Sequence, residues 1–288
     1  MASILPNTPP LLLTVLSPET LATVLPSKKL GHSLFVYDEL PSTNTFALEL
    51  ARNPMPQGTV VLADRQTAGR GRLQRSWFSP PDANIYGSLI FSFKHPFPAP
   101  GWIPLMAGMA IAQAIEASIK IKINLKWPND ILVDEQKIGG ILCESFKRDA
   151  TDTCVIIGFG INVNLSESAF PKDLERMASS LQIHAKHPLD RNQLIQSIIP
   201  SLEQGWDALN SQGPSSCQLA YSARCSTLGK QILAHFPDGT TAKGVAQSIG
   251  AHGQLQMVAA SSDTHGQSAR IVEVHAGDIR HVRTSSLH

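Results

Sequence analysis

Four arginines occur in one short stretch of the chain that also contains two glycines. The glycines, Gly69 and Gly71, permit unusual backbone angles and the close approach of a ligand. Guanidinium groups bind phosphate and carboxylate through paired hydrogen bonds. The pattern favours a mobile loop that closes over an anion, although a solvated basic loop would carry the same charges. The four arginines, all between Asp64 and Trp77, are Arg65, Arg70, Arg72 and Arg75.

A second polar segment runs from Lys126 to Asp130, where a cation, an aromatic ring, an amide and a carboxylate surround a proline. The oxygens of Asn129 and Asp130 could bind magnesium, which takes few protein ligands and keeps several waters. Pro-Asn-Asp is also ordinary turn chemistry. Lys137 follows shortly, just before two glycines and an apolar strand. A lysine at such a place lies either inside a site or on the surface.

A third segment, Gly158 to Asn164, is an apolar run that Asn162 interrupts. A buried amide needs hydrogen-bond partners, which are either backbone groups or a ligand. The chain carries no familiar nucleotide fingerprint. The run from Gly69 to Gln74 departs from G-x-G-x-x-G at its last position, and Gly229-Lys230 is not followed by the Ser or Thr of a P-loop. If ATP binds, another arrangement must hold it.

The elements that position these segments alternate between strands and helices as far as residue 212, and short glycine-punctuated strands follow. We predict an appendage over 1–33 with a short helix from Ser17 to near Pro26, a catalytic domain over 34–222 and a small all-β, barrel-like domain over 223–288. The expected helices are one that begins near Pro41, 104–119, and 190–209 with a kink at Pro200. The expected strands are 34–37, 59–63, 85–93, 121–126, 131–133, 141–146, 155–163, 231–234, 242–249, 255–259 and 270–275.

Composition limits the function classes. The chain has 288 residues, of which 42% are hydrophobic and 16% charged, and its net charge is +1. A packed core is therefore expected, without a whole-protein footprint for nucleic acid. The four cysteines form no C-x-x-C pair, which favours reduced thiols in a cytoplasmic protein. We find neither a signal peptide nor the run of roughly 20 apolar residues that spans a membrane.

The polar segments together resemble the motifs of biotin–protein ligases in their order and spacing. The resemblance extends from about Leu34 to the end of the chain. It implies an α+β fold with a mixed β-sheet flanked by helices, similar to class II aminoacyl-tRNA synthetases and shared with lipoate ligases. It also implies a small C-terminal β-barrel. The matching segments are Ser42-Thr43-Asn44, Gln66 to Pro80, Lys126 to Asp130, Lys137 to Leu142 and Gly158 to Asn162.

The resemblance further implies a reaction and the residues that perform it. The family activates biotin with ATP and magnesium as biotinyl-5′-AMP, then transfers biotin to a lysine of a biotin carboxyl carrier domain. Lys137 and Arg72 would be catalytic, residues 165–180 would form a flap over adenine, and Trp77 would belong to the core. The expected biotin-binding residues are Ser42, Thr43, Asn44, Gln66, Arg70, Gly71, Arg72 and Lys137. ATP would be bound by Arg72, Arg75, Trp127, Asn129, Lys137 and Asn162, and magnesium by Asn129 and Asp130.

Two departures from the family pattern distinguish this chain. Leu73 and Gln74 stand where some members have a longer basic loop, and residues 1–33 are too short for the DNA-binding winged helix of the regulatory members. The missing winged helix and the near-neutral net charge lead us to expect no nucleic-acid binding. We also expect no membrane binding, and a monomer or homodimer. The alternatives are a lipoate or octanoate ligase, which should carry a different arginine–glycine motif, and a non-catalytic biotin-sensing regulator, which needs a DNA-binding module.

Overall fold

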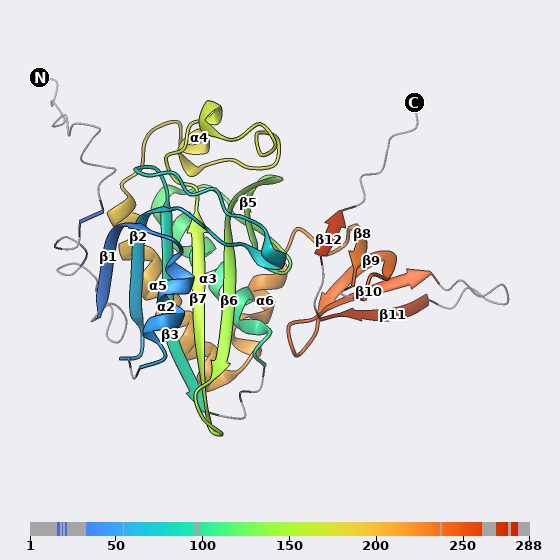
Figure 1. Ribbon diagram of the computed structural model, residues 1–288. Coiled ribbons are helices and arrows are strands. Elements are labelled where there is room, and N and C mark those ends of the chain that lie inside the picture. Colours follow the sequence, from blue (N-terminus) through green and yellow to red (C-terminus); the bar gives the residue numbers. More distant parts are fainter. Residues whose placement is uncertain are drawn as a thin grey trace, which may run out of the picture.

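A seven-stranded mixed sheet is the centre of the computed structural model (Figure 1). The structure describes residues 33–260 apart from 54, 95, 96, 98 and 237, together with 16, 17, 19, 21, 269–275 and 278–281. The strand order is β1-β2-β3-β7-β6-β5-β4, with β1 and β2 parallel and the other neighbours antiparallel. The strands are β1 (Leu34–Leu40), β2 (Thr59–Gln66), β3 (Ile85–Lys94), β4 (Asn124–Lys126), β5 (Asp130–Val133), β6 (Gln136–Lys147) and β7 (Asp152–Ile161).

Helices cover both faces of this sheet. Helix α2 (Thr43–Leu50) lies on one face, and α3 (Trp102–Ile119), α5 (Arg191–Gln212) and α6 (Ser215–Arg224) lie on the other (Figure 1). The side chains of strand β2 show that both faces of the sheet are buried by helices. Val60 and Leu62 enter the large core beneath α3, while Val61 enters the smaller core beneath α2. Because successive side chains point to opposite faces, a strand buried on both faces is apolar throughout.

Helix α3 is long and apolar enough to cross a membrane by length and composition alone, yet 67% of it is buried inside the structure. It packs between the sheet and α5, and its composition is that of a core helix. Pro200 lies within α5, which continues past it to Gln212.

Three features of the large domain differ most from the expectation, and one of them is the short helix α4 (Leu181–Ala185), which was not predicted. Strand β6 begins at Gln136, so Lys137 lies within the strand and not before it. The sequence did not indicate this start, because Gly139 and Gly140 interrupt the apolar pattern of the strand. Helix α6 was not expected, since Cys217 and Tyr221 are its buried residues and give almost no apolar periodicity.

The C-terminal part is all-β, as expected. Its strands form one antiparallel sheet whose order ends at β11 on one side and at β12 on the other. The turn after β9 docks on the large domain, because the Trp102 indole donates to Ala251 O (3.1 Å) and the Trp127 indole donates to Gly253 O (3.0 Å). The strands are β8 (Gln231–His235), β9 (Thr241–Ile249), β10 (Leu255–Ala260), β11 (Ala269–Val274) and β12 (Asp278–His281).

Part of the N-terminal appendage packs against the large domain. Leu16 and Leu21 are buried in its core, and the amide of Leu21 donates to Ser17 O (2.9 Å), as in one helical turn. The amide of Ser17 also donates to Asn192 Oδ1 at the start of α5 (3.1 Å). The expected end of this helix near Pro26 lies outside the described residues.

Candidate active site

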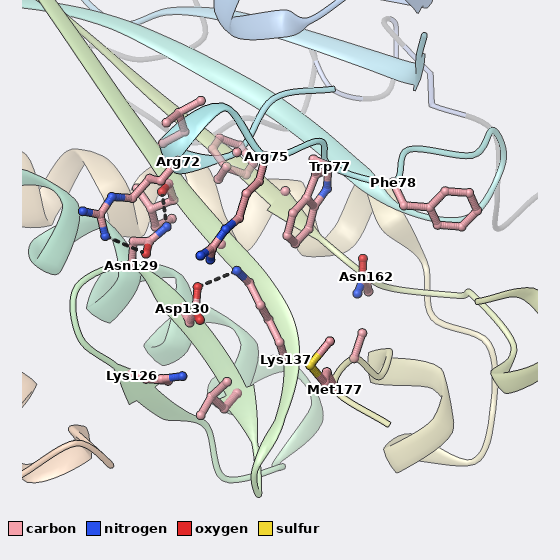
Figure 2. A pocket seen from close by; sticks show the side chains of 18 of the residues that line it. Arg72, Arg75, Trp77, Phe78, Lys126, Asn129, Asp130, Lys137, Asn162 and Met177 are labelled. Atoms are coloured by element: carbon pink, nitrogen blue, oxygen red, sulfur yellow. Dashed lines mark hydrogen bonds and ion pairs between the residues drawn. The ribbon is translucent and has the colours of Figure 1, made fainter. Parts of the chain in front are cut away.

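One cavity of ≈ 1380 Å³ opens between α2, β5, β6, β7 and the small domain. The segment Gly69–Trp77, called here the arginine loop, forms part of its wall (Figure 2). Every residue that the sequence analysis placed in the site lines this cavity, although the motifs lie up to 120 residues apart, from 42 to 162. The residues are Ser42, Thr43, Asn44, Gln66, Arg70, Gly71, Arg72, Arg75, Trp127, Asn129, Asp130, Lys137 and Asn162.

The N-terminus of α2 and the end of β2 make one end of the cavity polar but uncharged. The backbone amide of Thr43 donates to Gln66 Oε1 (2.9 Å), and Gln66 Nε2 donates to Ser79 Oγ (3.0 Å). Ser42 caps α2, with its hydroxyl 3.5 Å from the amide of Thr45. A ligand with neutral donors and acceptors would find matching groups here.

Ser88 supports the same polar end from beneath, through contacts with Thr43 and Asn44, and the sequence analysis did not find it. Its hydroxyl donates to Asn44 Oδ1 (2.7 Å) and lies 2.9 Å from Thr43 Oγ1. It is fully buried on β3 and surrounded in the sequence by apolar strand residues. Only the pairing of the strands shows that its side chain faces α2.

The arginine loop folds back on itself above the cavity. The amide of Trp77 donates to Gly69 O (2.9 Å), and the residues between them make a tight turn in which Leu73 and Gln74 have left-handed backbone angles (φ 54° and 59°). Arg72 Nη1 donates to Asn129 Oδ1 across the cavity (3.4 Å), and Figure 2 shows Arg75 extending from the loop toward Lys137 and Asp130. Two of the loop's guanidinium groups therefore stand at the charged end of the cavity.

The guanidinium of Arg70 turns toward a carboxylate of the protein. Its Nη2 lies 2.6 Å from Glu144 Oε1, and its Nη1 donates to Thr45 Oγ1 (3.2 Å). Arg70 is therefore occupied by a carboxylate of the protein, and only its backbone remains to face a ligand directly.

Lys137 lies inside the cavity and is held from both sides. Its amide donates to Met177 O (2.8 Å), and its carbonyl accepts from the amide of Ser179 (2.9 Å). Its Nζ is 2.5 Å from Asp130 Oδ1 and 5.2 Å from the centre of the Trp77 ring. The backbone contacts come from segment 165–180, which lines the cavity through Phe170, Leu174 and Met177.

Two of the expected ATP ligands make mainly structural contacts. The Trp127 side chain is 2% exposed, and its indole donates to the turn of the small domain. Asn162 Nδ2 donates to Ser179 O (3.0 Å), which ties the end of β7 to segment 165–180. Trp127 directly follows β4, and Asn162 directly follows β7. Both residues therefore line the cavity at the end of a strand.

The chain is similar to known proteins along most of its length. The model of the biotin/lipoate A/B protein ligase family matches residues 36–162. The biotin–[acetyl-CoA-carboxylase] ligase of Mycobacterium tuberculosis is 32% identical over 257 residues, which cover 87% of this chain and 89% of that protein. This chain belongs to the biotin protein ligase family.

A second sequence relative and a solved structure are also similar to this chain. It is 37% identical over 216 residues to the bifunctional ligase/repressor BirA of Bacillus subtilis, and the match covers 75% of this chain but only 66% of that relative. A biotin protein ligase from Aquifex aeolicus, solved in complex with biotin and ATP, superposes with a TM-score of 0.73 at 25% identity and covers 87% of this chain and 100% of that one. The expected fold class is thereby confirmed.

Trp77 lines the cavity of this ligase-family chain, whereas the sequence analysis assigned it to the core. A Cβ on Gly160 would stand 2.5 Å from Trp77 Nε1, so the glycine of β7 makes room for the ring. Trp77 Nε1 is buried and has no hydrogen-bond partner among the described residues. A single tryptophan in a sequence does not show whether a core or a cavity surrounds it, and here the answer depends on Gly160.

A buried ion pair fastens the base of the arginine loop, and the sequence analysis missed it. Arg191 is fully buried at the start of α5, and its Nη1 lies 2.7 Å from Asp64 Oδ1 and 2.8 Å from Asn84 O. Burial raises the pKa of the neighbouring Tyr86 well above its usual value, so its hydroxyl stays protonated and donates to Pro80 O (3.0 Å). Both ends of the loop are thus tied to the sheet.

The donor set available to magnesium is small. One oxygen of Asp130 contacts Lys137, and Asn129 Oδ1 accepts from Arg72. No group of three or more His, Cys, Asp or Glu side chains is assembled for a metal within the part of the chain that the structure describes. One carboxylate and one amide suit an ion that is held mainly by phosphates and water, which is how magnesium binds with nucleotides.

Proposed function

We propose that this protein is an ATP-dependent biotin–protein ligase that forms biotinyl-5′-AMP and transfers biotin to a lysine of a biotin carboxyl carrier domain. The observation that carries this proposal is a single cavity with a neutral polar end at Thr43 and Gln66 and a cationic end at Arg72, Arg75 and Lys137. Biotin has the same division, with a neutral ureido ring at one end and a carboxylate at the other.

The cationic end supplies what the first step needs. A carboxylate oxygen of biotin attacks the α-phosphorus of ATP, a new P–O bond forms, and the bond to pyrophosphate breaks. Two anions must meet, and fixed cations in a cavity with little water lower the cost of bringing them together. Lys137 lies beside Asp130, with the end of Arg75 near both in Figure 2, and its charge would offset the repulsion.

The second step needs access from outside. The carrier lysine, as a free amine, attacks the carbonyl carbon of the anhydride, the C–O bond to AMP breaks, and the amine loses a proton. The arginine loop and segment 165–180 border the cavity, so their closure would keep water from the anhydride before the carrier arrives. Met177, whose side chain is 62% exposed at this border, would cover adenine.

Magnesium fits the charged end as a partner of the ATP phosphates. Asp130 and Asn129 would hold it, and the ion would offset charge on the departing pyrophosphate. Asp130 would then face both Lys137 and the metal, since a carboxylate has two oxygens.

The polar end argues against lipoate or octanoate as the substrate. Both lack ureido donors and acceptors, and could not form hydrogen bonds with the polar groups around Gln66. A site built for hydrogen bonds rejects an analogue that cannot make them. The relatives named as acetyl-CoA-carboxylase ligases support a carboxylase carrier domain as the partner, and we place the reaction in the cytoplasm.

The proposal is tested by incubating the protein with biotin, ATP, magnesium and a biotin carrier domain. Mass spectrometry should find one biotin on one carrier lysine, and pyrophosphate should appear before the carrier is added. Lipoate in place of biotin should give no adduct. Absence of both pyrophosphate and adduct, with a protein that melts cooperatively, would exclude the proposed activity.

A further inference from the structure

Glu144 connects the arginine loop to the large domain. It lies on β6 with its side chain 24% exposed, and each oxygen has its own partner. Oε1 is 2.6 Å from Arg70 Nη2, and Oε2 accepts from Asn44 Nδ2 (2.9 Å). Arg70 also donates to Thr45 Oγ1 on α2 (3.2 Å). The first arginine of the loop is thus fastened to both β6 and α2.

Hydrogen bonds continue from Glu144 to the polar end of the cavity. Asn44, whose amide nitrogen donates to Glu144, accepts with its oxygen from Ser88 Oγ (2.7 Å). Ser88 lies 2.9 Å from Thr43 Oγ1, and the amide of Thr43 donates to Gln66 Oε1 (2.9 Å). The residues that would hold the ureido ring and the loop that would close over it therefore share one connected network.

The charges explain why a carboxylate belongs at this place. The arginine loop carries Arg70, Arg72 and Arg75, which repel one another in the absence of an anion. Glu144 neutralises Arg70 and makes no ion pair with Arg72, so it does not compete with a bound anion for the guanidinium of Arg72 at the charged end. Arg72 and Arg75 line the cavity, where phosphate would bind under the proposed function.

We propose that Glu144 is a positioning residue that latches the arginine loop, through Arg70, over bound biotinyl-5′-AMP. The latch rests on the proposed function, because the adenylate is the intermediate that the closed loop retains. Release of the adenylate requires the Glu144–Arg70 pair to separate. The two side chains are 24% and 39% exposed, so dissolved ions reach the pair and weaken it.

The test measures how long the protein retains the adenylate. The full-length protein is loaded with radiolabelled biotin, ATP and magnesium, pyrophosphate is removed, and the appearance of free biotinyl-5′-AMP is followed after a chase with unlabelled biotin. Glu144→Gln should release it about 2- to 5-fold faster, the range expected for a partly exposed ion pair. Release from the unchanged protein should accelerate with salt, and the variant should show a smaller salt dependence.

The chain offers a matched control in Glu116. Its side chain is also 24% exposed and also has two partners, Arg224 at 2.9 Å and the amide of Ile123 at 3.0 Å, but it lies on α3 outside the cavity. Glu116→Gln should leave adenylate release unchanged. If Glu116→Gln loses as much thermal stability as Glu144→Gln but releases the adenylate at the unchanged rate, general destabilisation does not explain the faster release from Glu144→Gln.

The partner residue gives a second, independent variant. Arg70→Met should accelerate release as much as Glu144→Gln, and the double variant should add little to either, because both substitutions remove the same contact. Equal release from Glu144→Gln and the unchanged protein, or fully additive effects, would overturn the latch alone. If the unchanged protein forms no adenylate, the proposed function itself fails and the latch with it.

Discussion

Lys137 Nζ lies 2.5 Å from Asp130 Oδ1, so the cation proposed for catalysis is already paired with a carboxylate of the protein. The pair holds the lysine inside the cavity and beside the Trp77 ring. An incoming carboxylate or phosphate adds a second anion to this lysine, while magnesium adds a second cation to Asp130. Binding of both substrates would therefore redistribute these contacts without leaving either charge alone.

Removal of the Lys137 ammonium should abolish most adenylate formation. We expect Lys137→Ala to slow pyrophosphate release by about 10²- to 10³-fold, the usual effect of losing one well-placed electrostatic group. Biotin affinity should fall less, because the ureido end is held by other residues. Lys137→Arg should rescue poorly, since a planar fork does not replace a compact ammonium. Lys122→Ala, at an exposed position, is the control, and near-normal turnover of Lys137→Ala would refute the assignment.

Asp130→Asn tests whether this carboxylate binds magnesium or only orients Lys137. If Asp130 binds magnesium, the metal concentration that gives half-maximal pyrophosphate release should rise several-fold, because a neutral amide is a weaker ligand than a carboxylate. Asp134→Asn, in the exposed turn after β5, should not change the metal requirement. A lower turnover with an unchanged metal requirement would mean that Asp130 only orients Lys137.

The arginine loop should become more protected when its ligand binds. Leu73 and Gln74 have left-handed backbone angles, and Arg72 Nη1 contacts Asn129 Oδ1 at 3.4 Å, so an anion bound beside Arg72 would add contacts that hold the tip of the loop. Hydrogen exchange of 69–77 should slow with biotin and ATP, whereas β9 should exchange equally in both states. Identical exchange of the loop with and without ligand would contradict closure.

The Arg191–Asp64 pair should contribute strongly to stability. Arg191 is 0% exposed, so Arg191→Met leaves Asp64 without its buried partner and should lower the free energy of unfolding by about 3 kcal/mol. Arg224→Met, which breaks a pair whose side chains are 26% and 24% exposed, should cost about 1 kcal/mol or less. Urea denaturation measures both variants, and equal losses would show that burial of Arg191 is not the cause.

The chemistry of the candidate site could be predicted from the sequence to a large extent. The motifs from Ser42 to Asn162 contain the amides, arginines and lysine that line the cavity, and the order and spacing of the whole set resemble the motifs of the family. The alternation of strands and helices followed from apolar patterns, because burial of both sheet faces gives continuous apolar strands. The sequence by itself determined which functional groups the site contains and in which order the large elements follow.

The tertiary structure decided where those groups point. Arg70 turns to Glu144, and Trp127 turns to the small domain, because residues distant in the sequence offer each a better partner than the cavity does. Trp77 enters the cavity because Gly160 has no side chain, and Ser88 joins the polar end because β3 pairs beside β2. Such contacts depend on strand register and helix docking. Sequence spacing carries no information about them, since their members are brought together only when the chain folds.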